Sequence, residues 1–142
     1  MFIDASAIVA ILNDEPGAAA LAAKIEAEKG RIVTSPIARF EAVVSLAAAR
    51  SRRGALKLTA EAIALAKQGV DAFLDEADAE QTPIVAETSD GAIDAAARYG
   101  RVVGHPASLN LGDCFAYAAA KLSAEAVLFV GEDFSRTDIK QA

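Results

Sequence analysis

Short runs of β-branched and apolar residues alternate along this chain with longer alanine-rich stretches. The runs at 31–34 (RIVT) and 126–130 (AVLFV) are typical of strands, and the second is apolar throughout, as in a strand buried on both faces. The stretches at 18–29 and 36–53 have the composition of helices. Strands separated by helices predict parallel crossovers. We therefore expect an α/β fold, a three-layer α/β/α sandwich around a mostly parallel sheet of four or five strands.

Start and stop signals divide the rest of the chain. Serine, threonine or asparagine precedes most of the predicted helices, and glycine follows several of them. The predicted strands are 1–4, 31–34, 83–86 and 126–130, and the predicted helices are 6–13, 18–29, 36–53, 59–77, 89–99 and 110–122, with Ser6, Ser35, Thr59 and Asn110 as the expected N-caps. We expect residues 133–142 to form a polar tail that ends in a short turn.

Length and composition restrict the classes of protein that the chain can belong to. With 142 residues, 54% of them hydrophobic, it is expected to form one domain, 1–142, with a substantial core. The net charge of −6 gives no general attraction for nucleic acid. A single cysteine, Cys114, excludes an internal disulfide and favours a reducing, cytoplasmic setting. The N-terminus shows no basic leader, and no apolar run reaches the roughly 18–20 residues of a membrane span.

Four carboxylates stand where the chain is predicted to pass between strands and helices. Asp4 ends the first predicted strand and Asp133 follows the last, while Glu41 and Asp113 lie in predicted helices. Ligands of open α/β sheets bind outside the carboxyl edge of the strands, so these acids are expected to converge there. Clustered carboxylates repel one another unless a cation lies between them. The pattern therefore predicts a pocket for Mg²⁺ or Mn²⁺ and the cleavage of phosphate esters.

Glu41 is the least ordinary of these acids. On a helix it shares a face with Ile37, Val44 and Ala48, and Phe40 beside it is also apolar. A carboxylate on an apolar stripe is destabilised unless a cation or a donor satisfies it. The alternative is an edge position from which the carboxylate reaches water. In the company of the other acids, we favour a metal ligand or its support.

The other acids have structural explanations of their own. Asp4 could cap the following helix, although Ser6 competes for that role and could also hydrogen-bond a metal-bound water or a phosphate. Asp113 falls three residues after the predicted cap Asn110, where an acid favours the helix dipole. Taken alone, Asp113 would be interpreted as a capping residue.

Asp133 has the weakest individual case. It follows a strand and a glycine, which places it on the carboxyl edge, but a solvated turn acid is a plausible alternative. Glu132 and Asp138 could take its place in the site.

A local basic cluster offers a possible contact for an RNA backbone. It consists of Arg50, Arg52 and Arg53, with Lys57 nearby. The more common explanation is a solvated helix end, where positive charge is favoured by the helix dipole.

Four segments together resemble the PIN domain, and more narrowly the VapC-type toxins of bacterial toxin–antitoxin modules. They are FIDASAIVAIL, FEAVVSL, LNLGDCFAYAAAK and LFVGEDFSRTDI, in that order. The resemblance implies an endoribonuclease that depends on Mg²⁺ or Mn²⁺, with Asp4, Glu41, Asp113 and Asp133 as its acidic residues and Ser6 as its small hydroxyl residue. Many PIN domains carry an acid where this chain has Gly131.

The resemblance also implies partners. It predicts an RNA substrate, a cognate VapB-like antitoxin, a homodimer and no membrane. The alternatives that remain are a PIN nuclease outside a toxin–antitoxin pair and a non-catalytic binding module with the same fold. Metal binding separates the last of these from a nuclease.

Overall fold

The computed structural model describes residues 1–54 and 57–142 as alternating strands and helices. In chain order the elements are β1 (Phe2–Ile3), α1 (Ala5–Leu12), α2 (Ala18–Ala27), β2 (Val33–Thr34), α3 (Pro36–Arg52), α4 (Ala60–Glu76), β3 (Glu80–Gln81), α5 (Ala86–Tyr99), the 3-10 helix η1 (Arg101–Val103), α6 (Leu111–Ser123), β4 (Val127–Leu128) and the 3-10 helix η2 (Phe134–Arg136). No helix in this described part is long and apolar enough to cross a membrane.

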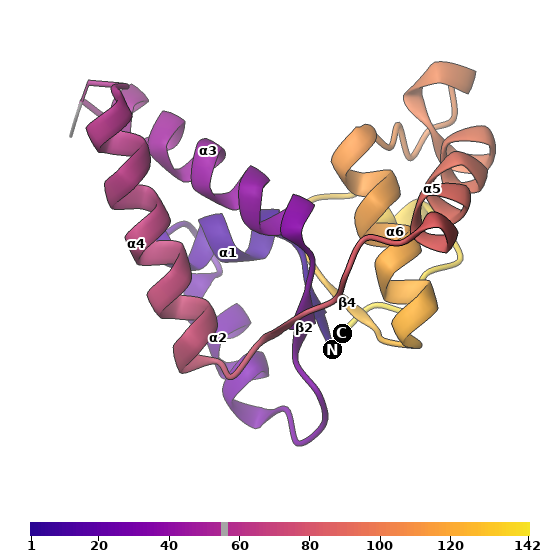
Figure 1. Ribbon diagram of the computed structural model, residues 1–142, viewed down its shortest axis with the longest axis horizontal. Helices are drawn as coiled ribbons and strands as arrows, with labels where there is room; N and C mark the ends of the chain where they lie inside the picture. Colours follow the sequence, from indigo (N-terminus) through magenta and orange to yellow (C-terminus); the bar gives the residue numbers. More distant parts are fainter. Residues whose placement is uncertain (55–56) are drawn as a thin grey trace.

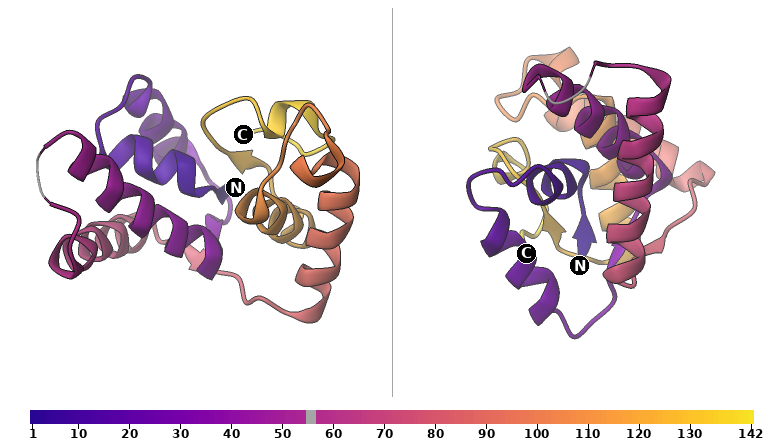
Figure 2. Two further views of the ribbon diagram at one scale, coloured as in Figure 1. Left: turned by 90° about the horizontal axis from the view of Figure 1, so that it is seen from above. Right: turned by 90° about the vertical axis from the view of Figure 1, so that its left-hand side faces the viewer.

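The strands form one parallel sheet in the order β3-β2-β1-β4. Helices α1 to α4 lie on one side of it and α5 and α6 on the other (Figure 1, Figure 2). The predicted α/β fold with a mostly parallel sheet of four or five strands is therefore confirmed, with four strands, all parallel. Because the strands are parallel, all their carboxyl ends lie at one edge, and this edge is where the acidic residues gather.

Successive residues of the central strands point into two separate cores. Phe2 and Val127 contribute to the core beneath α5 and α6, and Ile3 and Leu128 to the core beneath α1, α3 and α4. All four side chains are fully or almost fully buried. This alternation is the expected result of the two-residue period of a strand that is covered on both faces.

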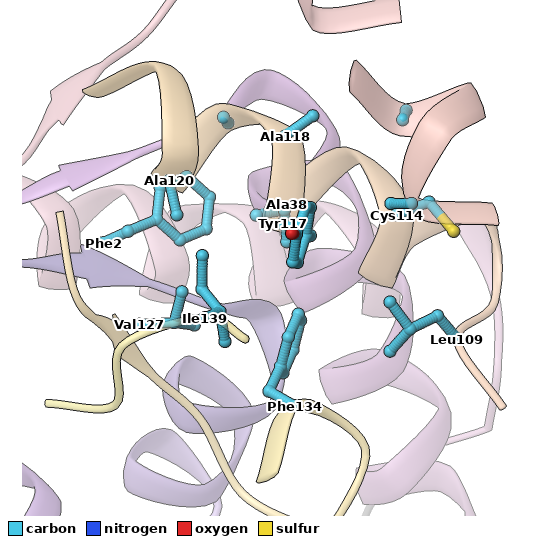
Figure 3. Close-up of a cluster of buried hydrophobic side chains, with 14 of the residues drawn as sticks. Phe2, Ala38, Leu109, Cys114, Tyr117, Ala118, Ala120, Val127, Phe134 and Ile139 are labelled. Atoms are coloured by element: carbon cyan, nitrogen blue, oxygen red, sulfur yellow. The ribbon is translucent and has the colours of Figure 1, made fainter. Parts of the chain in front are cut away.

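The polar tail closes the first of these cores. Phe134 and Ile139 are buried against Phe2 and Val127, and Figure 3 shows these side chains directed into one cluster beneath Ala120. The segment after β4 therefore packs against the sheet, and it carries Asp133 past the carboxyl edge.

The third strand lies elsewhere than the sequence predicts. The PIVA run at 83–86 was expected to form it, but β3 is Glu80–Gln81, and Ile84 and Val85 are exposed before α5 begins at Ala86. As an edge strand, β3 pairs through its backbone, with Glu80 N donating to Ile32 O at 3.0 Å. Its side chains need not be apolar because they enter no core, so hydrophobicity was the wrong guide here.

The caps agree with the sequence at three helices and differ at one. Ser35, Thr59 and Asn110 each accept a hydrogen bond from the backbone near the start of α3, α4 and α6. The prediction of Ser6 as the cap of α1 is wrong, because Asp4 holds that position and accepts from Ser6 N. Helix α1 consequently begins at Ala5, directly after the strand.

Candidate active site

A cleft of about 290 Å³ opens at the carboxyl edge of the sheet. Its lining residues come from the end of β1, from α1, α3 and the start of α6, and from the segment after β4. They are Asp4, Ala5, Ser6, Val9, Glu15, Glu41, Ser45, Asn110, Asp113 and Val130. Three of the four predicted acids therefore meet in one cleft, although they are separated by up to 109 positions in the sequence.

Asp4 is buried at the floor of the cleft, with 5% of its surface exposed. Its Oδ2 accepts from Ser6 N at 2.9 Å and from Ser6 Oγ at 2.5 Å. Burial raises the pKa of Asp4; the hydrogen bonds from Ser6 partly oppose this, and the charge of Asp133 adds to the rise. The carboxyl group thus serves as a helix cap and lines the cleft.

Ser6 connects Asp4 to the segment after β4. While its hydroxyl donates to Asp4, the same oxygen accepts from Val130 N at 3.0 Å. Both functions of the hydroxyl are used within the protein. In this arrangement Ser6 fixes the position of Asp4 relative to the segment after β4, which leads to Asp133.

Glu41 projects from α3 toward the start of α6 and is about half-buried. Its carboxylate lies directly against the α-carbon of Gly112. The pKa of Glu41 is raised to about 7, first by burial and then by the charges of Asp4 and Asp113. A carboxyl group with this pKa can exchange a proton near neutral pH, and a cation bound beside it would favour its ionised form.

The surroundings of Glu41 differ from the predicted apolar stripe. Phe40 is 65% exposed and Val44 is 39% exposed, so this side of α3 is not its core face. The helix instead buries a stripe that includes Ala42 and Leu46. The desolvation of Glu41 comes from the walls of the cleft, which only the tertiary structure supplies.

Asp113 caps its helix and faces the cleft at the same time. Its Oδ2 accepts from Asn110 N at 2.8 Å, and Asn110 Oδ1 accepts from Asp113 N at 3.2 Å. Burial is the largest cause that raises the pKa of Asp113 to about 6, and Asp4 and Asp133 also raise it. Asp113 can therefore cap its helix and line the cleft at the same time, because the capping bond uses only its Oδ2.

Asp133 lies on the exposed segment after β4, outside the lining of the cleft. Its charge nevertheless raises the pKa of both Asp4 and Asp113, which places it near them. The preceding Gly131 has φ 113°, a conformation that suits glycine. An acid at position 131 would be strained in this loop, whereas Asp133, two residues further on, has an ordinary φ of −61° that any residue can adopt.

The two substitutes for Asp133 make other contacts. Asp138 accepts from Tyr117 Oη at 2.5 Å and pairs with Arg98 at 3.3 Å, and the Tyr117 hydrogen bond is the largest cause that lowers its pKa to about 2. This network ties the tail to α5 and α6. Glu132 accepts from Ser135 Oγ at 3.1 Å within its own turn.

Two polar residues that line the cleft were not among the predictions. Ser45 lies four positions after Glu41 on α3, and this spacing could have indicated it. Glu15 follows α1 and accepts from Asn13 Nδ2 at 2.8 Å. No periodicity or motif in the sequence distinguishes Glu15 from an ordinary surface acid.

The basic cluster on α3 has a structural role in two of its members. Arg53 Nη1 donates to Asn13 O at 2.7 Å, and Arg50 Nη2 donates to Leu12 O at 3.3 Å. These are carbonyl groups at the end of α1, so the two arginines cap that helix from α3. Arg52 is exposed.

The acidic side chains have the chemistry of divalent-cation ligands, but their present arrangement is not a coordination site. Asp4, Glu41 and Asp113 offer hard oxygen ligands from three elements, and their charges repel one another. Across residues 1–54 and 57–142, no three histidine, cysteine or acidic side chains are arranged to hold a metal ion as they stand. The three residues that would hold a cation, Asp4, Glu41 and Asp113, line one cleft, but they do not form a ready-made coordination site.

Known proteins are similar to this chain in sequence and in fold. The PIN domain family matches residues 1–140. A VapC ribonuclease of Rhizobium meliloti (strain 1021) is 48% identical over 97% of this chain and 98% of its own length. Ribonuclease VapC42 of Mycobacterium tuberculosis (strain ATCC 25618 / H37Rv) is 38% identical over 100% of this chain and 98% of its own length.

A solved structure supports the fold independently. The crystal structure of Mycobacterium tuberculosis VapC20, a sarcin–ricin loop cleaving toxin, superposes with a TM-score of 0.72 at 14% identity, over 99% of this chain and 97% of that one. The chain belongs to the PIN domain family, within its group of VapC ribonucleases. The family resemblance stated from the sequence motifs is thereby confirmed.

Proposed function

We propose that this chain is a divalent-metal-dependent endoribonuclease and the toxin of a type II, VapBC-like toxin–antitoxin module, which cleaves RNA to arrest growth. The observation that carries the proposal is the convergence of Asp4, Glu41 and Asp113 on one cleft. Full-length similarity to VapC ribonucleases supports it. The proposed reaction requires no side-chain nucleophile, because a water molecule can attack the phosphodiester.

Each acid has a distinct part in this hypothesis. Asp4 and Asp113 are held by hydrogen bonds to Ser6 and Asn110, so they provide fixed oxygens at the floor and wall of the cleft. Glu41 completes the cleft from α3, and Asp133 approaches from the loop after β4. Bound Mg²⁺ or Mn²⁺ would supply positive charge toward the scissile phosphate and lower the pKa of a water molecule.

The raised pKa values of two of these acids favour cation binding. Burial is the main reason why Glu41 and Asp113 are difficult to ionise; the charge of Asp4 raises the pKa of both, and the charge of Asp113 further raises that of Glu41. A divalent cation in the cleft removes this repulsion. We therefore expect cation binding to be accompanied by the release of protons near neutral pH.

Two substitutions test the site. Asp4→Asn and Asp113→Asn keep a side chain that can still cap a helix, so the fold should persist. Cleavage of RNA in the presence of Mg²⁺ should fall by roughly 100-fold or more, since even outer partners of metal ligands are worth about 10- to 100-fold. Asp94→Asn, at an exposed position of α5, is the matched control and should cleave like the parent.

The outcomes separate the proposal from its alternatives. Parent protein that neither binds Mn²⁺ in calorimetry nor cleaves RNA would indicate a non-catalytic module. Asp4→Asn protein with parental cleavage would show that the site is elsewhere. Cleavage in vitro without growth arrest on induction would favour a PIN nuclease outside a toxin–antitoxin pair.

The proposal includes partners. We expect a VapB-like antitoxin, encoded by a short gene directly upstream, that copurifies with this protein and suppresses its growth arrest. We expect a homodimer, which sedimentation would detect. The cytoplasm, where RNA and a cognate antitoxin would be available, is the proposed location.

We expect RNA to be bound through local basic residues, because the net charge of −6 does not attract a polyanion. Of the predicted contacts, Arg52 is exposed, whereas Arg50 and Arg53 donate to carbonyl groups of α1. Arg52 is accordingly the member of the cluster that we expect to contribute most to RNA affinity.

A further inference from the structure

Gly112 lies beside the acidic cleft, next to the lining residue Asp113, although it is not itself among the lining residues. It is the second residue of α6, buried between Leu111 and Asp113. The carboxylate of Glu41 reaches from α3 across its α-carbon. A β-carbon built on Gly112 would overlap both oxygens and the Cδ of Glu41, and these are the three atoms nearest to it.

The backbone does not itself call for glycine at this position. Gly112 lies within a regular helix, whereas the glycines with positive φ are Gly17, Gly54, Gly104 and Gly131. Glycine is unfavourable in helices relative to alanine because it loses more conformational freedom on folding. The structure shows one reason for glycine at this position: the Glu41 carboxylate occupies the space that a side chain would fill.

We propose that Gly112 is a positioning residue of this active site, whose missing side chain leaves the place in which the Glu41 carboxylate faces Asp4 and Asp113. The proposal rests on the proposed function, since it concerns the same cleft. It accounts for a feature that the acids alone leave unexplained, namely how a glutamate from α3 comes against the first turn of α6. The missing side chain on α6 leaves the space, and the carboxylate that fills it comes from α3.

The physical consequence of filling this space is specific. The atoms that would be displaced are the far end of a flexible side chain, so the carboxylate would move and the helix would stay. Glu41 would swing out toward solvent, where its charge is better hydrated and farther from Asp4 and Asp113. A methyl group at residue 112 should therefore remove Glu41 from the site without unfolding the protein.

The variant Gly112→Ala tests this directly in the full-length protein. We expect its Mn²⁺ affinity, measured by calorimetry, and its RNA cleavage to fall by about 10- to 100-fold, as when a partner that orients a metal ligand is lost. The melting temperature without metal should stay at or above that of the parent, because alanine favours the helix. A large drop in melting temperature would overturn the proposal in favour of a packing role.

Gly69→Ala is the matched control. Gly69 lies within α4, and a β-carbon built there meets no atom within 4 Å. This variant introduces the same methyl group into a helix, away from the cleft. Its Mn²⁺ affinity and its cleavage should equal those of the parent, whereas unchanged values in Gly112→Ala as well would overturn the proposal.

A double-mutant cycle shows whether Gly112 acts through Glu41. In a Glu41→Ala background the added Gly112→Ala change should not weaken Mn²⁺ binding further, because no carboxylate remains to be displaced. In a Glu41→Asp background, where the carboxylate is shorter by one methylene, the loss should be smaller than in the parent. Equal losses in all three backgrounds would overturn the proposal.

A metal-free crystal structure of Gly112→Ala separates this proposal from the proposed function. The Glu41 carboxylate should lie outside the cleft in that variant, and a carboxylate still over residue 112 would overturn the positioning role. If the parent neither binds Mn²⁺ nor cleaves RNA, the proposed function fails, yet the crystal structure still decides whether Gly112 places Glu41.

Discussion

At the scale of single residues, Ser6 shows how a small side chain can organise the acidic cleft. Its hydroxyl donates to Asp4 and accepts from Val130 N, so it bridges the end of β1 and the segment after β4. The bridge keeps Asp4 oriented and fixes the direction of the loop that carries Asp133. Its contribution is geometric, and the cleft depends on it although the serine bears no charge.

Replacing Ser6 by alanine should therefore weaken both stability and activity. Val130 N loses its acceptor and Asp4 loses a donor, which should lower the free energy of unfolding by about 1–2 kcal/mol in urea titrations. RNA cleavage should fall as well, because Asp4 is less well oriented. Ser123→Ala, which removes a hydroxyl from the lining of a different cavity, is the control. Equal unfolding midpoints and equal cleavage in both variants would contradict this role.

At the scale of elements, Arg50 of α3 and Arg53 directly after it stabilise the end of another helix. Arg53 and Arg50 donate to Asn13 O and Leu12 O, which are carbonyl groups at the end of α1. Helix α1 starts with Asp4 as its cap and ends under these guanidinium groups. Side chains thus cap both ends of α1, the helix that carries Ser6, and stabilise this side of the cleft.

The variants Arg53→Ala and Arg52→Ala should separate a structural role from an RNA contact. Arg53→Ala should lower the free energy of unfolding by about 1 kcal/mol, because a partly buried charged hydrogen bond is lost. Arg52→Ala should leave the unfolding curve unchanged but raise KM for RNA and weaken the salt dependence of binding. An Arg53→Ala protein as stable as the parent, or an Arg52→Ala protein with parental KM and salt dependence, would contradict the assignment concerned.

At the scale of the whole molecule, the cleft makes stability depend on pH and on divalent cations. The folded protein raises the pKa of Glu41 to about 7 and that of Asp113 to about 6, from values near 4.5 and 3.8 in the unfolded chain. Between about pH 4 and pH 7 the folded state therefore binds more protons than the unfolded state. The free energy of unfolding contributed by these groups falls as pH rises through that range.

We accordingly expect the melting temperature in EDTA to be lower at pH 8 than at pH 6, by a few degrees after solvent screening of these half-buried groups. Asp138, with its pKa lowered to about 2, loses its contribution only in stronger acid, so it does not mask the effect. Glu41→Gln should flatten the dependence, and saturating Mg²⁺ should remove most of it. A melting temperature in EDTA that rises from pH 6 to pH 8 would contradict the repulsion in the cleft.

The sequence was most informative where the structure depends on neighbours along the chain. The caps Ser35, Thr59 and Asn110 were predictable because an N-cap bonds to a backbone group only a few residues away. The buried strands β1 and β4 were predictable because both faces of a central strand must be apolar. The motifs around Asp4, Glu41, Asp113 and Asp133 indicated the family before any distances were known.

The tertiary structure decided what depends on residues far apart in the chain. It placed β3 at Glu80–Gln81, because edge pairing uses backbone groups that any residue offers. It gave Glu41 its surroundings, since the burial that raises its pKa comes from the walls of the cleft and its charged neighbours from the end of β1 and from α6. It also showed that Gly112 leaves room for that carboxylate, a steric relation between residues 71 positions apart that no local pattern records.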